Sequence, residues 1–219
     1  MPIDNPTHDN QVAATSRAHA VTTSDKVCMF DMDDTLYDYA GQLRRDLELL
    51  RSPGEEPLPQ NLWSGAAPWL KRRIDLIRSQ PRWWLNLPKF QLGWEIYAVA
   101  VDIGYEVEIL TKGPSSSSNA WSEKAERVWK DFGGRVALNI AGGTKRRTYA
   151  RVLVDDYPPY VLDWLAHRPR GLVIMPAHDY NAGIEHPNVI RYDGTNIDVV
   201  VGAMTRAFQR APGEPWRED

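Results

Sequence analysis

The sequence predicts an α/β fold in which a parallel sheet carries helices on both faces. Short apolar, β-branched runs alternate with stretches of helical periodicity along most of the chain. Several of these runs end in polar residues of matched character, as expected of strands whose carboxyl ends share one edge of a parallel sheet. A first crossover of about 50 residues is far longer than a plain βαβ unit needs, which predicts a small helical insertion after the first strand.

The composition is that of one globular domain with an embellishment. Of 219 residues 42% are hydrophobic, and the formal net charge is −3. This balance gives no electrostatic basis for nucleic acid or a membrane as the main partner, so we expect a small-molecule ligand. The sequence is also compatible with a homodimer. The single cysteine, Cys28, excludes an intrachain disulfide and predicts a packed thiol in a reducing, cytoplasmic environment.

The two ends of the chain are predicted to lie outside the folded domain. Residues 1–24 are polar and lack the apolar centre of a secretory signal, so we expect a disordered arm. Residues 212–219 predict a frayed tail. Between them we expect a core domain formed by 25–38 and 89–211, with the insertion at 39–88. No stretch of sequence is long and apolar enough to predict a membrane span.

The elements of the core follow in order along the chain. Helical patterns at 92–104 and 122–134 end at Gly104 and Gly133, where glycine suits a helix C-cap. A last helix is predicted at 196–211, with its first residue, an asparagine, as the candidate N-cap. Apolar runs predict six strands, at 26–32, 105–111, 135–140, 151–156, 171–176 and 188–193.

The insertion is predicted to be a helical lid, because insertions at the carboxyl edge of a parallel sheet lie over the place where such folds bind ligands. Its basic run at 70–78 either meets an anionic substrate or presents a charged face to solvent. Its tryptophans either pack a small helical core or stack on a ligand. They are Trp63, Trp69, Trp83 and Trp84.

Polar side chains end three of the predicted strands. Because these ends share one edge of the sheet, we expect them to converge, together with Lys145 from the loop before the fourth strand. Crowded carboxylates need a compensating cation, and oxygen ligands are those that Mg²⁺ prefers. The sequence therefore predicts a magnesium site at which the ion and Lys145 neutralise a phosphate. The strand-end residues are Asp31 and Asp33, Thr111 and Lys112, and Asp155 and Asp156.

Each of these residues also has a structural interpretation. An isolated Asp-x-Asp is typical of a turn or a helix cap, and Asp34 and Thr35 are expected to brace the turn after the first strand. Lys124, in a predicted helix, is either a solvated residue or a substrate contact. His178, beyond the fifth strand, is either structural or close to the site. The basic residues that rival Lys145 are Lys112, Lys124, Arg146 and Arg147.

The motifs "DMDDT", "ILT", a lysine and "LVDD" occur in the order seen in haloacid dehalogenase-like (HAD) phosphohydrolases, which the chain resembles over residues 26–176. Within that superfamily it is most similar to the 5'(3')-deoxyribonucleotidases, through "NLP", "YEVEILTKGP", "EKAERVWKDFG" and "TKRRTYARVLVDDYPP". The resemblance implies a Rossmann-like HAD core with a helical cap, and Mg²⁺-dependent hydrolysis of (deoxy)nucleoside monophosphates. Lys112 and Gly113 stand where that family has Ser and Pro.

The resemblance also implies roles for individual residues. Asp31 would attack phosphorus to form an aspartyl-phosphate, and Asp33 would act as general acid and then as general base. Asp31, the backbone carbonyl of Asp33, and Asp156 would hold Mg²⁺, supported by Asp155. Lys145 would bridge phosphate and Asp31. The residues implied to contact substrate are Thr111, Lys112, Lys124, Lys145, Trp83 and Trp84.

Two alternatives remain at this stage. One keeps the chemistry but changes the substrate to a sugar phosphate, or to a polynucleotide end held by the basic run of the insertion. The other is a nucleotide-binding module without catalysis, which would be marked by the loss of Asp31 or Asp33. Both aspartates are present.

Overall fold

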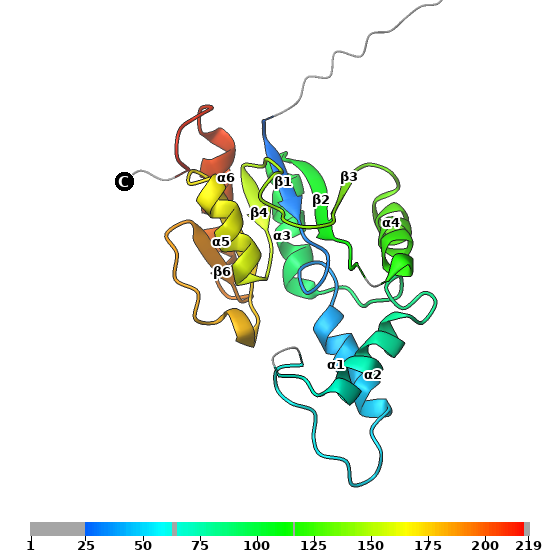
Figure 1. The fold of residues 1–219 in the computed structure, drawn as a ribbon. Helices are drawn as coiled ribbons and strands as arrows, with labels where there is room; N and C mark the ends of the chain where they lie inside the picture. The colour runs from blue at the N-terminus through cyan, green and yellow to red at the C-terminus, as the bar shows by residue number, and fades with distance from the viewer. Residues whose placement is uncertain (1–24, 63–64, 116, 217–219) are drawn as a thin grey trace, which may run out of the picture.

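Six parallel strands form one sheet in the computed structural model, which describes residues 25–62, 65–115 and 117–216. Their order in the sheet is β3-β2-β1-β4-β5-β6, which places β1 and β4 side by side at the centre (Figure 1). The arm expected at 1–24 and Trp63 lie outside the described residues. The strands are β1 (Val27–Phe30), β2 (Glu106–Lys112), β3 (Ala137–Ala141), β4 (Val152–Val154), β5 (Leu172–Pro176) and β6 (Val189–Tyr192).

Helices cover both faces of the sheet, which confirms the predicted fold class. One core cluster joins α3 and α6 to one face, and the other joins α5 to the opposite face. α5 was not predicted, although its Pro158 and Pro159 suit the first turn of a helix. The helices are α1 (Tyr39–Leu49), α2 (Pro68–Arg78), α3 (Gln91–Ile103), α4 (Ser118–Phe132), α5 (Pro158–His167) and α6 (Ile197–Gln209), with a 3₁₀ turn, η1 (Asp179–Asn181).

β1 divides its side chains between the two cores, because successive residues of a strand point to opposite faces. Cys28 and Phe30 pack in the cluster that contains α3 and α6, whereas Val27 and Met29 pack in the cluster with Trp164 of α5. Burial raises the pKa of the Cys28 thiol well above its usual range. The prediction that Cys28 is a packed, unreactive thiol is consistent with this position.

The helix ends agree with the sequence except at α6. Gly104 and Gly133 follow α3 and α4 with φ of 97° and 59°, the left-handed conformation that glycine adopts without strain. Asn196 occupies the N-cap position of α6 but makes no capping hydrogen bond. Its amide instead donates to the Arg191 carbonyl at 2.9 Å, so it braces the preceding loop.

Of the frayed tail predicted at 212–219, the part that the structure describes ends at Trp216 and packs onto the domain through that residue. The Trp216 side chain is buried in the cluster that contains α3 and α6. Arg151, also buried, donates to the carbonyls that end α6, on Ala207, Phe208 and Arg210. A helix end leaves such carbonyls without intrahelical partners, so this guanidinium acts as a C-terminal cap.

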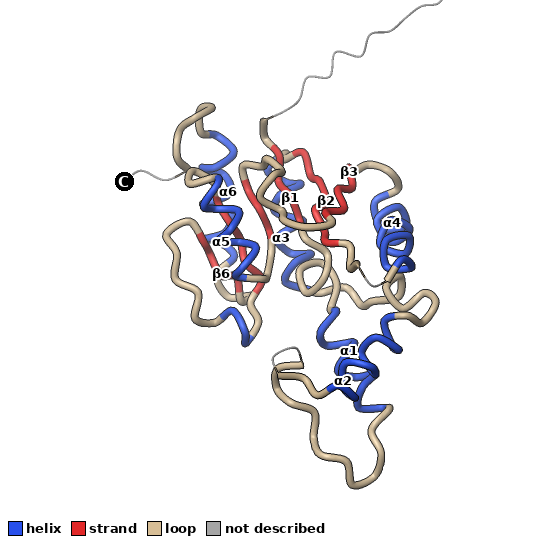
Figure 2. Tube along the Cα trace, in the orientation of Figure 1, coloured by secondary structure: helices blue, strands red, loops and turns tan. Residues whose placement is uncertain are grey.

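The insertion consists of α1 and α2, joined by a long loop and placed beyond the end of the sheet (Figure 2). Its last turn is fixed to α4 by two charged side chains. The Glu123 carboxylate accepts backbone N–H groups, and the Arg127 guanidinium donates to backbone carbonyls of the same turn. The turn residues bonded in this way are Arg82, Trp84, Leu85 and Leu87. Within the described residues, no helix has the length and apolarity needed to cross a bilayer.

Candidate active site

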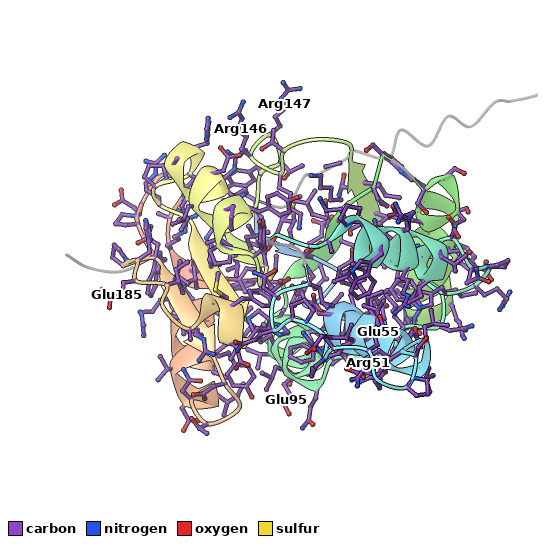
Figure 3. All side chains as sticks on the ribbon, turned by 60° about the horizontal axis from the view of Figure 1, so that its bottom comes forward. Arg51, Glu55, Glu95, Arg146, Arg147 and Glu185 are labelled. Atoms are coloured by element: carbon purple, nitrogen blue, oxygen red, sulfur yellow. The ribbon has the colours of Figure 1, made fainter. Side chains whose placement is uncertain are left out.

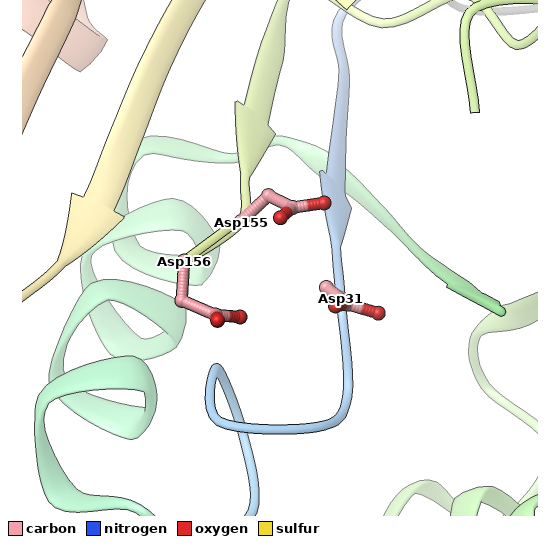
Figure 4. A group of neighbouring side chains, drawn as sticks. All are labelled: Asp31, Asp155 and Asp156. Atoms are coloured by element: carbon pink, nitrogen blue, oxygen red, sulfur yellow. The ribbon is translucent and has the colours of Figure 1, made fainter. Parts of the chain in front are cut away.

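The carboxyl ends of β1 and β4 bring three aspartates together. The Asp31 N–H donates to the Val154 carbonyl at 2.9 Å, which extends the pairing of the two strands by one residue. Asp31 therefore lies beside Asp155 and Asp156 (Figure 4). One carboxylate oxygen of each of the three lies within 4.8 Å of the others. Convergence of these strand ends was predicted, because neighbouring parallel strands end at the same edge.

The turn after β1 is braced by Asp34 and Thr35, as predicted. Asp34 adopts a left-handed conformation with φ of 57°, which aspartate tolerates better than most residues. Its carboxylate accepts the Ala40 N–H at 2.7 Å, which anchors the start of α1. The Thr35 hydroxyl donates to the Asp156 carboxylate at 2.7 Å. The turn thus joins the insertion to the aspartates at the end of β4.

Lys145 lies between two of these aspartates. Its side-chain nitrogen is 2.8 Å from the Asp31 carboxylate and 2.7 Å from the Asp155 carboxylate. Burial alone would lower the pKa of Lys145, but the two carboxylates raise that pKa above its usual value. Two of its three N–H groups are used, which leaves one for a ligand. Arg146 and Arg147, its neighbours in sequence, project from the surface of the molecule (Figure 3).

Lys124 is the second buried ammonium group of the site. It extends from α4 and donates to the Asp33 carboxylate at 2.6 Å, to the Thr111 hydroxyl at 3.0 Å and to the Lys112 carbonyl at 2.9 Å. The interpretation of Lys124 as a solvated surface residue is therefore wrong. Since all three of its N–H groups are used, a direct bond to substrate would require one of these bonds to break. The Thr111 hydroxyl accepts from Lys124 and keeps its own hydrogen to donate.

The carboxylates of the site outnumber its ammonium groups. Burial and the charges of neighbouring aspartates together raise the pKa of Asp155 and of Asp156 to about 7. Burial and the Asp156 charge raise the pKa of Asp34 to about 8. Burial also raises the pKa of Asp33, against the charge of Lys124. Carboxylates that resist ionisation in this way are compensated by a bound cation.

The donor set fits a hard divalent cation. Asp31 and Asp156 line the cavity described below and offer carboxylate oxygens, the ligands that Mg²⁺ prefers. Asp155 is fully buried, and its two oxygens accept from Lys145 at 2.7 Å and from the Tyr157 N–H at 3.0 Å. We therefore assign Asp31 and Asp156 as the residues that would hold Mg²⁺, with Asp155 orienting Lys145. The Asp33 carboxylate does not belong to this group of three.

Two residues beyond β5 complete the acidic site. The Tyr180 hydroxyl donates to the Asp156 carboxylate at 2.5 Å. The His178 ring is stacked between Phe90 and Tyr180, with centroid distances of 4.7 and 4.9 Å. Its Nε2 is 2.6 Å from the Asp34 carbonyl, which can only accept, so Nε2 carries the proton. Tyr180 was not predicted as a site residue; its place just after β5, the strand next to β4, was the available signal.

A cavity of about 1470 Å³ opens onto the carboxylates and is lined by both the core and the insertion. Trp84 lines it and stacks on Tyr39, with ring centroids 5.3 Å apart and planes at 17°. Lys112 also lines it and donates to the Tyr160 hydroxyl at 2.9 Å. Trp83 is not among the lining residues; its indole N–H donates to Asp46 at 2.7 Å. Of the predicted aromatic pair, the structure brings only Trp84 to the cavity.

Comparison with known proteins gives a limited result. No protein-family model matches the chain, and no curated protein matches it. One similar solved structure is that of a protein named as HAD-hydrolase YfnB from Bacillus subtilis, bound to magnesium, with 12% identity and a TM-score of 0.43 over 76% of this chain and 92% of that chain. Another is a haloacid dehalogenase-like hydrolase from Burkholderia xenovorans LB400, with 16% identity and a TM-score of 0.43 over 76% and 91%. Similarity at this level assigns no activity.

Proposed function

We propose that the chain is a Mg²⁺-dependent phosphomonoesterase of the HAD type that hydrolyses (deoxy)nucleoside monophosphates through an aspartyl-phosphate on Asp31. One observation carries the proposal. Two carboxylates at the floor of a single cavity, Asp31 and Asp33, each have their own buried lysine, Lys145 and Lys124. Such a pair can divide the work between a nucleophile and a proton donor.

In the first step the Asp31 carboxylate attacks phosphorus. A bond forms between its oxygen and phosphorus, the ester bond breaks, and the leaving oxygen takes a proton from Asp33. Mg²⁺ held by Asp31 and Asp156 would supply positive charge against the phosphate dianion. The spare N–H of Lys145 and the Thr111 hydroxyl would donate to the phosphate oxygens from behind the cavity wall, since both side chains are buried and neither is among the lining residues.

Asp33 suits the part of general acid and then general base. It must hold a proton at the start of the reaction, and burial raises its pKa in that direction. After the first step, ionised Asp33 takes a proton from water as the water attacks the phosphorus, which releases phosphate and restores Asp31. The Lys124 bond at 2.6 Å fixes the direction in which Asp33 points.

The cavity wall supports a nucleotide as the substrate. Trp84 and Tyr39 stack on each other at the insertion side of the cavity; both rings are mostly buried, and the part that reaches the cavity gives an apolar aromatic contact for a base. Tyr157, Tyr160 and Tyr180 line the same cavity from the core side. Its volume exceeds the usual range of small-molecule pockets, so a whole nucleoside monophosphate has room.

Phosphate release tests the proposal directly. Wild-type protein and Asp31→Asn are assayed with Mg²⁺ on the common nucleoside monophosphates, on sugar phosphates and on 5'-phosphorylated oligonucleotides. We expect turnover of nucleotides by the wild type and a loss of about 10³-fold or more in Asp31→Asn. Asp102→Asn is the matched control, because Asp102 is exposed near the end of α3, at the opposite edge of the sheet. Turnover of the other esters alone would contradict the proposed substrate class. No turnover of any ester would contradict the proposed phosphomonoesterase activity.

A further inference from the structure

The basic run of the insertion contains one residue that faces the cavity. Lys71 and Arg72 of α2 are exposed, and Arg73 forms an ion pair with Glu55 at 2.6 Å. Arg78, in the last turn of the same helix, lines the cavity. The alternatives left open by the sequence, a charged solvent face or a contact with an anionic substrate, thus apply to different residues of the same run.

Arg78 holds hydrogen-bond donors that no described residue accepts. Its side chain is only 17% exposed, and its Nε is buried without a partner. The carboxylate closest to it belongs to Asp75, at 3.8 Å, and that side chain is 67% exposed. A separation of 3.8 Å is too long for a hydrogen bond, and a buried donor without an acceptor costs free energy. An acceptor brought by a ligand would remove that cost.

Arg44, the other arginine that lines the cavity, differs from Arg78 in that its guanidinium has acceptors within the protein. Its guanidinium donates to the backbone carbonyls of Pro59 and Gln60, at 3.0 and 2.7 Å. Those bonds give Arg44 a structural task in the loop between α1 and α2. Arg78 has no comparable bonds within the described residues, so its guanidinium remains available to a ligand.

The position of Arg78 is fixed relative to the reacting end of the cavity. Its guanidinium carbon lies 5.4 Å from the centroid of the Trp84 ring, and the Lys124 nitrogen lies 5.1 Å from the same centroid. Lys124 in turn holds Asp33. Trp84 thus contacts both Arg78 and the lysine that holds the proposed proton donor, and Arg78 and Asp33 line the same cavity. A substrate whose ester group sits at Asp31 can reach Arg78 with its leaving group.

We propose that Arg78 forms a second anion subsite, which binds a second acidic group, phosphoryl or carboxylate, on the leaving group of the substrate. The proposal rests on the phosphomonoesterase function and narrows its substrate to esters with two separated anionic groups. A guanidinium presents paired N–H donors that match the oxygens of phosphate and carboxylate. Stacking against Trp84 holds this fork in place before the ligand arrives.

Binding to a catalytically inactive background tests the subsite. Calorimetry with Mg²⁺ is carried out on Asp31→Asn alone and combined with Arg78→Gln, Arg78→Lys or Arg72→Gln. The ligands are a nucleoside 5'-monophosphate, the 3',5'-bisphosphate of the same nucleoside, and a phosphorylated hydroxy acid. Arg72→Gln is the matched control, because it removes the same charge from the exposed face of the same helix.

We expect Arg78→Gln to weaken binding of a ligand with a second anion by about 10- to 100-fold, and that of the monophosphate by less than about threefold. Whichever doubly anionic ligand shows the loss identifies the second group as phosphoryl or carboxylate. Arg78→Lys should restore part of the affinity, because it keeps the charge without the fork. Arg72→Gln should leave all three affinities unchanged.

Equal weakening of all ligands would assign Arg78 a structural role, and no weakening of either doubly anionic ligand would remove the subsite. Melting temperatures of the variants show whether the fold is kept. Turnover of the monophosphate and of a simple aryl phosphate by wild-type protein separates the two proposals. Turnover without Arg78-dependent binding defeats only the subsite, whereas Arg78-dependent binding without any turnover defeats the phosphomonoesterase function.

Discussion

The edge of the sheet and the insertion build the two halves of the cavity by different means. At the edge, Asp31 and Asp156 follow paired strands, so backbone hydrogen bonds set their positions. In the insertion, Trp84 and Arg78 are placed by side-chain packing and by the contacts of Glu123 with the turn that ends the segment. The sheet edge therefore fixes the chemistry, and the insertion can change selectivity without disturbing it.

The two buried lysines of the site differ in the same way, one belonging to the sheet edge and the other to the helix that anchors the insertion. Lys145 comes from the loop before β4 and is enclosed by carboxylates of the sheet edge. Lys124 comes from α4, the helix that also anchors the insertion, and holds an aspartate whose side chain is 28% exposed. We therefore expect removal of Lys145 to lower both stability and activity, and removal of Lys124 to affect mainly catalysis.

The largest effect is expected for Lys145→Met. Loss of one partner from a buried charge pair leaves Asp31 and Asp155 without compensation, which should lower the free energy of unfolding by about 3 kcal/mol. Denaturant titration in the absence of Mg²⁺ measures the change. An unchanged free energy of unfolding would mean that Lys145 does not compensate these carboxylates in solution.

Lys124→Met should lower kcat by about 100-fold, because Asp33 loses the bond that orients it. The free energy of unfolding of Lys124→Met should fall less than that of Lys145→Met, because the Asp33 side chain is partly exposed to water. The pH profile distinguishes positioning from simple structural damage: Asp33 must start protonated, so it sets the alkaline limb of kcat/KM, and loss of the ammonium charge should move that limb to higher pH. A reduced rate with an unmoved limb would contradict the assigned role.

The pH dependence of stability should be set by the sheet edge. Unfolded aspartates ionise near pH 4, whereas Asp155 and Asp156 in the folded protein have pKa values of about 7. Between these values the folded state holds protons that the unfolded state has lost, so without Mg²⁺ the free energy of unfolding should fall by about 2 kcal/mol for each aspartate from pH 5 to pH 8.

Mg²⁺ should make the free energy of unfolding less dependent on pH, because the ion replaces the protons that these aspartates hold. Asp156→Asn should reduce the same pH dependence in the absence of Mg²⁺. Denaturant titrations at several pH values, with and without Mg²⁺, measure the slopes. A free energy of unfolding that rises with pH in the absence of metal would contradict the raised pKa values of the two aspartates.

Trp84→Ala should show the smallest and most selective effect on catalysis, while the loss of a buried indole should lower the free energy of unfolding by about 3 kcal/mol. Loss of a stacking surface should raise KM for nucleoside monophosphates by about tenfold, while kcat for a small aryl phosphate should change little. Leu76→Ala is the control, because Leu76 belongs to the same segment and is exposed. Equal losses on both substrates would show that Trp84 supports the reacting groups rather than the leaving group.

The sheet and its acidic edge could be predicted because they depend on local patterns. Apolar runs mark the strands, and parallel topology alone makes Asp31 and Asp156 neighbours. Residues placed by the tertiary structure could not be predicted in this way. The burial of Lys124 depends on the orientation of α4, and Tyr180 reaches Asp156 only because of the turn after β5. α5 begins with two consecutive prolines, which are as typical of a turn as of the first turn of a helix, so its pattern did not predict a helix. The sequence around Trp216 gives no local sign that this residue is buried.

Anomalous diffraction from crystals soaked in Mn²⁺, as a stand-in for Mg²⁺, tests most directly whether the strand ends form a metal site. We expect one strong peak within coordination distance of carboxylate oxygens of both Asp31 and Asp156, with Lys145 still bound to Asp31. A map without a peak at these two residues, at a concentration of Mn²⁺ that supports turnover, would contradict it.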